Sequence, residues 1–322
     1  MIDVKGVIGN TPMIKIDYEK NGKQKSVYCK LEYYNLTGSI KDRIAYYIIV
    51  NAKLRGDLKD SMPIVEATSG NTGIALSALG AVFGHPVFIY MPEWVSKERI
   101  KIMKSFGASV YLVSEEQGGF KRCIEEANNK AKEVNGFLAN QFSNYDNILA
   151  HYETTGKEIL DKLPKDVYGF VSGVGTGGTL MGTGKRLKEN FKDIKIVAIE
   201  PDKMSIISQG KILGQHKIEG IGDEFVPDLL DKNFIDDVLL VNDDDAINMS
   251  RKLAKDLGIG VGISSGANFL GCVQLQESTD KPIVTVFADD NKKYLSTELA
   301  NDVVLDDKFL SNEIKLLNYE FL

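Results

Sequence analysis

Short apolar, β-branched runs alternate with longer segments of helical periodicity along most of the chain. Runs typical of buried strands are Pro63–Glu66, Val87–Met91, Ser109–Val113, Tyr168–Ser172, Lys195–Glu200, Asp237–Val241 and Pro282–Phe287. Segments with a helical pattern are Ile40–Leu54, Thr72–Phe83, Ser96–Phe106, Gly119–Val134, Leu149–Leu163, Gly177–Asn190, Asp243–Leu257 and Ser265–Glu277. Strands that alternate with helices form βαβ units, whose parallel sheets carry helices on both faces. The pattern therefore predicts an α/β protein.

A polar spacer at residues 140–147 divides this pattern into two parts. The chain has 322 residues, the length of about two ordinary domains of roughly 150 residues each. We therefore expect two α/β units that meet near residue 150. Ligands of such folds bind at the carboxyl ends of strands or between domains, and we expect the functional site there.

The composition is that of a soluble globular protein. Hydrophobic residues make up 43% and charged residues 26%, which excludes disordered and fibrous classes. The net charge of −6 lacks the basic field that binding to a phosphate backbone needs, so we expect no nucleic-acid partner. The longest uncharged run, Ala67–Pro92, begins with polar residues and contains the breaker Gly84-His85-Pro86. A helix followed by a strand explains this run better than a membrane span.

The cysteines bear on the compartment and on metal binding. Cys29, Cys123 and Cys272 are odd in number and form no CxxC pair. This pattern is neither a disulfide framework nor a zinc site, and it is typical of a reducing cytoplasm. Charged residues within the first 17 positions leave no uninterrupted apolar core for a signal peptide. We therefore expect a cytoplasmic protein without a bound metal.

A glycine-rich turn, Ser172–Thr179 (SGVGTGGT), follows a predicted strand and opens a predicted helix. Its bare backbone N–H groups and the helix N-terminus can bind an anion such as phosphate. The hydroxyls of Thr176 and Thr179 add further donors. A tight turn that only packs the helix against the sheet is the alternative interpretation.

The same turn also matches the dinucleotide-binding fingerprint GxGxxG. The three glycines are Gly173, Gly175 and Gly178, and Glu200 lies near the spacing expected of the ribose-binding acid. A nicotinamide-dependent dehydrogenase is therefore a rival hypothesis. A lone fingerprint is weak support, and it leaves two other turns unexplained.

The second of these turns is Thr68–Gly73 (TSGNTG), which also lies between a predicted strand and a predicted helix. Its hydroxyls, amide and free N–H groups at a helix N-terminus suit a carboxylate as well as a phosphate. An ordinary N-cap by Ser69, Asn71 or Thr72 is the alternative. Two such turns in one chain favour a set of ligands with two anionic ends.

The third turn places Lys41 at the start of a predicted helix, in the sequence GSIKDR. The positive end of the helix disfavours an ammonium ion and favours the neutral amine that imine chemistry requires. A solvated lysine is the commoner alternative. We expect Asp42 and Arg43, which follow, to pair with each other and hold the turn.

Taken together, these turns resemble the cysteine synthase/cystathionine β-synthase family, enzymes of the tryptophan-synthase-β-like type that use pyridoxal 5′-phosphate. The motifs GSIKDR, EATSGNTG, ERIKIMKSFGA, ANQF, HYETTG, GVGTGGT, EGIG and GISSGA occur in the family's order, and the resemblance runs from Ile8 to Thr297. It implies fold type II of the pyridoxal-phosphate enzymes: two three-layer α/β domains with mostly parallel, twisted sheets. The smaller domain would span residues 36–150, and the larger would combine 1–35 with 151–322. The cofactor would lie in the cleft between them.

The resemblance also implies roles for individual residues. Lys41 would form the Schiff base with the cofactor and shuttle the α-proton, Asn71 would bond to the ring hydroxyl, and Ser264 would face the pyridine nitrogen. The cofactor phosphate would be held by Gly175, Thr176, Gly177, Gly178 and Thr179, and the substrate α-carboxylate by Thr68, Ser69, Asn71, Thr72 and Gln141. His151 and His216 have no acid–base partner in the sequence, and we interpret both as packing or hydrogen-bonding residues.

A serine opposite the ring nitrogen restricts the chemistry. Many pyridoxal-phosphate enzymes place a carboxylate there, which protonates the nitrogen and deepens the electron sink. Because a serine hydroxyl cannot do this, loss of a β-leaving group is favoured as the α-proton departs, giving an α-aminoacrylate to which a nucleophile adds. The resemblance thus implies β-replacement or β-elimination on a cysteine- or serine-type amino acid, with hydrogen sulfide as nucleophile or leaving group.

The chain departs from the family at Gly220–Phe225 (GIGDEF), where cysteine synthases typically have GIGAGF. A carboxylate at Asp223 can activate water as a general base beside the substrate. This predicts an alternative direction, in which L-cysteine and water give L-serine and hydrogen sulfide; a solvated turn residue is the other interpretation of Asp223. Cystathionine β-synthases typically carry a bulky polar pair here, so condensation of that type is a second alternative.

Family analogy also implies partners. A homodimer is expected, with a serine acetyltransferase as a possible protein partner and an amino acid and sulfide as small-molecule partners. A non-catalytic protein on the same scaffold is the remaining alternative, and the intact Lys41 with both anion turns argues against it. The C-terminal tail, residues 306–322, mixes charged and aromatic residues and is expected to cover a neighbouring surface.

Overall fold

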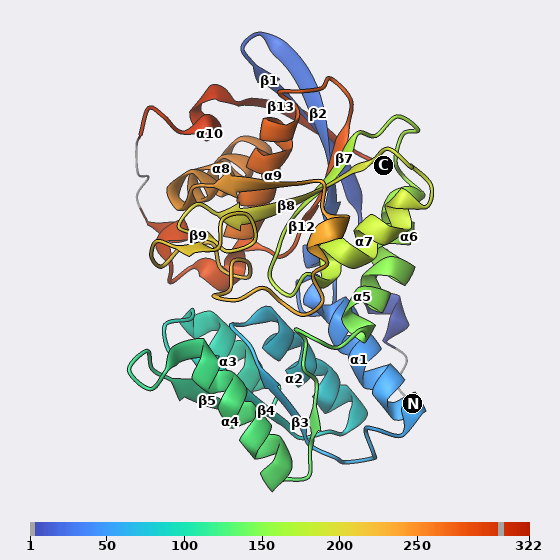
Figure 1. Ribbon diagram of the computed structural model, residues 1–322, viewed down its shortest axis with the longest axis vertical. Coiled ribbons are helices and arrows are strands. Elements are labelled where there is room, and N and C mark those ends of the chain that lie inside the picture. Colours follow the sequence, from blue (N-terminus) through green and yellow to red (C-terminus); the bar gives the residue numbers. More distant parts are fainter. Residues whose placement is uncertain (1–3, 302–305) are drawn as a thin grey trace.

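The structure is a computed structural model that describes residues 4–301 and 306–322. A seven-stranded sheet forms the upper part in Figure 1, and a four-stranded sheet forms the lower part. A short antiparallel pair, β9 (Met204–Ser205) and β10 (Lys211–Ile212), lies outside both. The alternation of strands and helices along the chain has therefore produced two α/β units.

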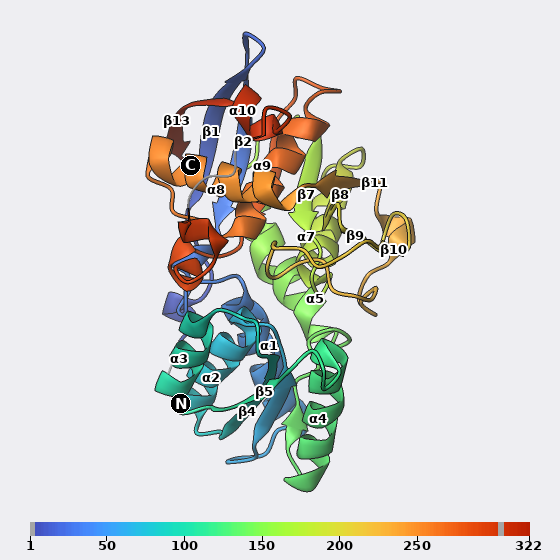
Figure 2. The same ribbon diagram turned by 90° about the vertical axis from the view of Figure 1, so that its left-hand side faces the viewer.

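The smaller unit is built on a parallel sheet with the order β5-β4-β3-β6. Its strands are β3 (Ile64–Ala67), β4 (Val87–Pro92), β5 (Ser109–Val113) and β6 (Phe137–Leu138), and its helices are α1 (Lys41–Arg55), α2 (Asn71–Phe83), α3 (Lys97–Ser105) and α4 (Gly119–Glu133). Alternate residues of a strand point to opposite faces. Ile89 and Met91 of β4 accordingly share a core with α1, α2 and α3, whereas Tyr90 packs with α4. Figure 2 shows α4 on one side of this sheet and the other three helices on the opposite side.

The larger unit is built on a mixed sheet with the order β11-β8-β7-β12-β2-β1-β13. Its strands are β1 (Met13–Lys20), β2 (Lys23–Leu31), β7 (Gly169–Gly173), β8 (Lys195–Pro201), β11 (Asp237–Val241), β12 (Ile283–Phe287) and β13 (Lys315–Phe321). Parallel pairing joins β11 through β2, whereas β1 pairs antiparallel with both β2 and β13. The C-terminal tail thus forms an edge strand.

Helices cover both faces of the larger sheet. One apolar core joins it to α8 (Asp243–Leu257) and α9 (Ile263–Leu275). A second core joins the opposite face to α7 (Gly178–Lys188) and to a continuous helical segment. That segment consists of α5 (Asp146–Ala150), the π-helical turn η3 (His151–Thr155) and α6 (Gly156–Leu160). The remaining short helices are α10 (Leu310–Glu313), η1 (Lys5–Val7), η2 (Glu32–Tyr34), η4 (Lys232–Phe234), η5 (Asn291–Tyr294) and η6 (Glu298–Ala300).

The predicted domain boundaries can be set beside these elements. Every strand of the four-stranded sheet lies within residues 36–150, and every strand of the seven-stranded sheet lies outside that range. Residue 150 falls inside the continuous segment α5–η3–α6, so the boundary there stays a prediction. Within the described part of the chain, no helix combines the length and apolar character needed to cross a membrane.

Candidate active site

The three predicted turns meet at one cavity between the two units. The β3–α2 turn supplies Thr68–Thr72, and Lys41 enters from the first position of α1. The β7–α7 turn supplies Gly173, Gly175, Thr176, Gly177 and Thr179. Of the residues predicted for the site, the cavity is lined by Lys41, Thr68, Ser69, Asn71, Thr72, Gln141, Gly175, Thr176, Gly177, Thr179, Asp223 and Ser264. Gly178 lies just behind this wall, where a Cβ atom on it would come within 1.8 Å of Asn147 Oδ1.

Lys41 is half-buried in this cavity. Burial lowers the pKa of its amine to about 8, although the carboxylates of Asp223 and Asp289 act in the opposite direction. A lowered pKa agrees with the expectation from the sequence that the neutral amine is favoured. Its main cause, however, is burial rather than the helix end. A larger fraction of the amine is therefore neutral near pH 7 than for an ordinary lysine.

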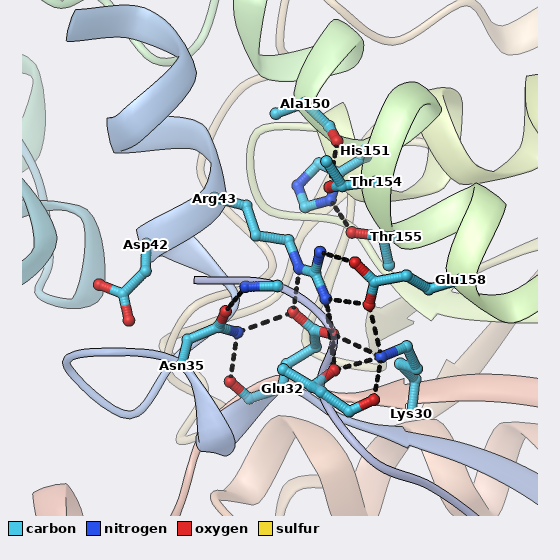
Figure 3. A network of polar contacts seen from close by, with 12 residues as sticks. Lys30, Glu32, Asn35, Asp42, Arg43, Ala150, His151, Thr154, Thr155 and Glu158 are labelled. Carbon is cyan, nitrogen blue, oxygen red and sulfur yellow. Dashed lines mark hydrogen bonds and ion pairs between the residues drawn. The ribbon is translucent and has the colours of Figure 1, made fainter. Parts of the chain in front are cut away.

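The expected pairing of Asp42 with Arg43 is wrong. The Arg43 guanidinium instead donates to Glu32 at 2.6 and 2.8 Å and to Glu158 at 2.7 and 2.8 Å (Figure 3). Asp42 accepts hydrogen bonds from the backbone N–H and the hydroxyl of Thr37 at 2.7 and 2.5 Å. Consecutive helix positions point in directions about 100° apart, so neighbouring side chains do not face each other. The start of α1 is instead anchored by Arg43 to η2 and α6.

The glycine-rich turn is shaped by close backbone approaches. Gly177 has φ of +82°, a left-handed conformation that side chains other than glycine's rarely adopt. A Cβ atom on Gly175 would lie 2.5 Å from the carbonyl oxygen of Gly220. The hydroxyl-bearing Thr176 and Thr179 are buried and line the cavity. Backbone N–H groups and two hydroxyls at the start of α7 form a donor set that fits a phosphate.

Side chains of the second turn form hydrogen bonds with Gln141 and Asp289, which lie outside it. Thr72 donates to Gln141 Oε1 at 2.6 Å, and Gln141 Nε2 donates to the Ala67 carbonyl at 3.1 Å. Asn71 Nδ2 donates to Asp289 Oδ2 at 2.8 Å. Among the described residues, the buried Oδ1 atom of Asn71 has no hydrogen-bond partner. A buried polar atom without a partner is costly, and the residue that carries this one lines the cavity.

Asp223 faces the same cavity as Lys41. Burial raises the pKa of its carboxyl group to about 6, with the Lys41 amine opposing this shift and Glu224 adding to it. Glu224 itself is exposed and is not part of the lining. Of the two acidic residues in GIGDEF, only Asp223 is therefore placed to act inside the cavity.

Two charged residues of the cavity lining, Arg99 and Glu219, were missed from the sequence. Arg99 of α3 donates to Glu219 and, at 3.0 Å, to Ser96 Oγ, and its guanidinium lies 4.4 Å from the centre of the Tyr294 ring. Arg99 and Glu219 belong to the quoted motifs ERIKIMKSFGA and EGIG, so their presence in two family motifs was the available signal. A Cβ atom on Gly70 would lie 2.3 Å from the Arg99 side chain, which covers the second turn.

Glu200, the ribose-binding acid that the dehydrogenase hypothesis requires, forms hydrogen bonds outside the cavity. Glu200 is buried and accepts hydrogen bonds from the backbone N–H groups of Ile207 at 2.8 Å and Ser208 at 3.0 Å. The Ser208 hydroxyl donates to the same carboxylate. Glu200 does not line the cavity, so the fingerprint lacks its ribose-binding partner there.

Comparison with known proteins decides the family. The model of the family described as "Pyridoxal-phosphate dependent enzyme" matches residues 4–289. A cysteine synthase of Staphylococcus aureus is 40% identical over 300 residues, which cover 92% of this chain and 96% of that protein. The chain belongs to the pyridoxal-phosphate dependent enzymes.

Solved structures of the family agree. A hydrogen sulfide-producing enzyme from Fusobacterium nucleatum has a TM-score of 0.94 and 49% identity, covering 99% of this chain and 98% of that one. An aspartate-to-asparagine variant of a hydrogen sulfide-producing enzyme, solved with an α-aminoacrylate intermediate, has a TM-score of 0.95 and 49% identity over 98% of this chain and 97% of that one.

The family membership confirms several predictions from the sequence. The fold is that of fold-type II pyridoxal-phosphate enzymes, with two α/β domains, and the cofactor is pyridoxal 5′-phosphate. The activity is β-replacement or β-elimination on a serine- or cysteine-type amino acid, with sulfide as a reactant or product. The donor set of the β7–α7 turn and the partnerless Asn71 Oδ1 fit this cofactor.

Proposed function

We propose that this enzyme converts L-cysteine and water into L-serine and hydrogen sulfide. The C–S bond at the β-carbon breaks, sulfide leaves with a proton, and the hydroxyl group of water takes its place. The observation that carries the proposal is the Asp223 carboxyl group, which lines the same cavity as the Lys41 amine. Support also comes from the Fusobacterium enzymes, which are described as hydrogen sulfide-producing.

Lys41 is proposed to attach the cofactor and to move the α-proton. When bound, pyridoxal phosphate supplies an electron sink that lets the bond between Cα and hydrogen break. An amine with a pKa of about 8 takes a proton from Cα and returns it readily near neutral pH. The cavity position of Lys41, at the first residue of α1, supports this role.

The two anion turns are proposed to hold the two anionic groups. The cofactor phosphate is assigned to Gly175, Thr176, Gly177, Gly178 and Thr179, and the substrate carboxylate to Thr68, Ser69, Asn71, Thr72 and Gln141. Asn71 is also assigned to the ring hydroxyl, and Ser264, in the first turn of α9, to the ring nitrogen. All of these except Gly178 line one cavity, which supports their acting on one ligand set.

Asp223 is proposed to accept a proton from the water that attacks the β-carbon. Its carboxyl group is ionised above a pKa of about 6, so it is a base at neutral pH. An aspartate-to-asparagine variant of the Fusobacterium enzyme was captured with an α-aminoacrylate intermediate. A site with weakened activation of water would accumulate such a species, which supports a role for an aspartate in this step of the related enzyme.

The experiment replaces Asp223 with Asn and measures serine and sulfide formed from cysteine. We expect serine formation to fall about a hundredfold or more, the usual contribution of a general base. The synthesis of cysteine from O-acetylserine and sulfide needs no water base and should be retained. Glu224→Gln, one residue along and exposed, is the matched control with near-normal activity. Unchanged serine formation in Asp223→Asn would overturn the proposal, and homocysteine in the same assay tests the condensation alternative.

Three further expectations from the sequence stay proposals. A homodimer and a serine acetyltransferase partner are supported by family analogy alone. A reducing cytoplasm is supported by Cys29, Cys123 and Cys272, each of which is buried as a free thiol.

A further inference from the structure

The segment α5–η3 supports the glycine-rich turn from behind the cavity. Asn147 and His151 lie four residues apart on this segment, and both are fully buried. Asn147 Nδ2 is 2.9 Å from the Thr176 hydroxyl oxygen, and His151 Nε2 is 3.2 Å from that of Thr179. Two adjacent side chains of one helix face thus contact the two hydroxyls of the proposed phosphate site.

This contact depends on glycines in α7. A Cβ atom on Gly178 would lie 1.8 Å from Asn147 Oδ1. One on Gly182 would lie 2.3 Å from the Ile148 carbonyl oxygen and 2.7 Å from His151 Cβ. Without side chains at these positions, α7 approaches the α5–η3 segment closely enough for the hydrogen bonds to form. The π-helical turn begins at His151, and such turns are frequent at functional sites.

The orientation of the Asn147 amide follows from its second partner. Nδ2 also donates to the carbonyl oxygen of Gln141 at 2.9 Å. A carbonyl oxygen only accepts, so the NH₂ group of Asn147 must point toward both Gln141 and Thr176. The Thr176 hydroxyl is then the acceptor in its bond with Asn147. Its own hydrogen remains available to a ligand in the cavity that Thr176 lines.

The direction of the hydrogen bond between His151 and Thr179 depends on the tautomer of the imidazole. Its Nδ1 atom is 2.9 Å from the Thr155 hydroxyl oxygen (Figure 3), and its Nε2 atom faces Thr179. Burial lowers the pKa of the imidazole well below its ordinary value, and the cations of Lys41 and Arg43 lower it further. A neutral imidazole carries one N–H, and the two tautomers have opposite effects. If Nδ1 holds the hydrogen, Nε2 must accept the Thr179 proton; if Nε2 holds it, that proton stays free.

We propose that Asn147 and His151 are positioning residues that donate to Thr176 and Thr179, leaving both threonine hydrogens directed at the cofactor phosphate. The proposal requires His151 to be the Nε2–H tautomer, with the Thr155 hydroxyl donating to Nδ1. It rests on the proposed function only in assigning the phosphate to this turn. Asn147 also holds the Gln141 backbone, so it joins the phosphate turn to the substrate side.

A pair of isosteric variants tests the role of His151. The amide nitrogen of His151→Gln occupies the place of Nε2 and can still donate to Thr179, whereas that of His151→Asn occupies the place of Nδ1 and cannot reach it. For each apoenzyme, dissociation constants for pyridoxal phosphate and for pyridoxal, which lacks the phosphate, are measured by fluorescence titration. The preference for pyridoxal phosphate is the ratio of the pyridoxal dissociation constant to the pyridoxal phosphate dissociation constant. We expect this ratio to fall about tenfold in His151→Asn, as expected for the loss of one hydrogen bond to a charged group. In His151→Gln the ratio should be largely kept.

Asn147→Leu tests the second donor in the same titration, with an expected loss of similar size. Thermal unfolding of each apoenzyme shows whether a variant has folded. If folded His151→Asn and Asn147→Leu keep the wild-type preference, the inference is wrong. If the wild-type enzyme itself shows no preference for pyridoxal phosphate over pyridoxal, the assignment of the phosphate to this turn has failed instead.

The tautomer is measured independently of affinity. The chain has three histidines, so ¹⁵N-labelled holoenzyme gives few imidazole signals, and His151→Gln assigns those of His151. We expect a protonated Nε2 and an unprotonated Nδ1. A protonated Nδ1 with a bare Nε2, or an imidazolium, would overturn the inference even if the variants do not fold.

Discussion

Two side chains of opposite chemistry share the cavity, and burial moves the pKa of each toward neutrality. The Lys41 amine falls to about 8, and the Asp223 carboxyl group rises to about 6. Between these values the amine is still mostly protonated and the carboxyl group mostly ionised. Small environmental changes are then enough to move a proton at either site, as acid–base catalysis near neutral pH requires.

The pKa of Asp223 sets an expected pH dependence. Only the ionised carboxylate accepts a proton from water, so serine formation from cysteine should rise as pH rises through about 6. The rise should appear in kcat/KM measured between mildly acidic and neutral pH. It should be missing from the residual activity of Asp223→Asn. A pH profile that is flat across this range in the wild-type enzyme would contradict the role of Asp223.

The sequence pointed most readily to residues that belong to a motif, and the roles of those residues stay predictions. Lys41 and the two turns were found because helix ends and glycine-rich turns have local signatures, and the structure brings them to one cavity. The partners of Arg43 were not predictable in this way. Glu32 and Glu158 lie in segments far apart along the chain, and the fold alone brings them together.

Helix α1 carries Lys41, and its first turn is held by a buried ionic network. Lys30 and Arg43 both bind Glu158, at 2.8 and 2.7 Å, and Arg43 also binds Glu32 (Figure 3). Although burial raises it, the pKa of Glu32 is brought down to about 2 by the Arg43 guanidinium. A fully buried carboxylate of this kind depends on its partner.

Two arginines of α1 provide a matched test of that dependence. Arg43→Met leaves the buried Glu32 carboxylate without its closest cation, with the Lys30 amine 3.8 Å away, and should lower the free energy of unfolding by about 3–5 kcal/mol. Arg55→Met removes an arginine from the far end of the same helix, whose side chain is 48% exposed in its pairs with Asp57 and Asp146. Asp57 is exposed, and the buried Asp146 keeps its hydrogen bond from Asn51 Nδ2 at 2.8 Å, so that change should cost at most about 1 kcal/mol. Equal losses for the two variants in urea unfolding would contradict this account of α1.

The strands β1 and β2, whose exposed face is charged, were not predicted from the sequence. The segments MIKIDYEK and KQKSVYCKL of β1 and β2 alternate apolar residues with Lys, Asp and Glu, as antiparallel strands with one solvated face do. The signal was the turn Asn21-Gly22, where both residues have positive φ. Asn-Gly between alternating segments is a strong hairpin pattern. The buried parallel strands were easier to predict because they are continuous apolar runs.

The two units of the molecule are joined across the cavity by Arg99 and Glu219. Arg99 lies on α3 of the smaller unit, and Glu219 lies in the larger unit, four positions before Asp223. Ser96, at the start of α3, also donates to the carbonyl oxygen of Lys293 in η5 at 2.8 Å. These contacts connect the loop that carries Asp223 to the unit that carries the second anion turn.

Arg99→Gln should therefore loosen that loop. We expect faster backbone hydrogen exchange in residues 217–225 and a fall of about tenfold to a hundredfold in kcat/KM for cysteine, because small displacements of a catalytic group are costly. The control is Arg122→Gln, which removes ion pairs on the exposed surface of α4. Wild-type exchange rates and activity in Arg99→Gln would show that the contact between the units has no such role.

The reaction itself can be followed through its oxygen atom. The wild-type enzyme is incubated with L-cysteine in water enriched in heavy oxygen, and the products are identified by mass spectrometry while sulfide is measured. We predict serine that carries the heavy isotope in its hydroxyl group, formed in equal amount to sulfide. Sulfide released without labelled serine, or no reaction of cysteine at all, would contradict the proposed function.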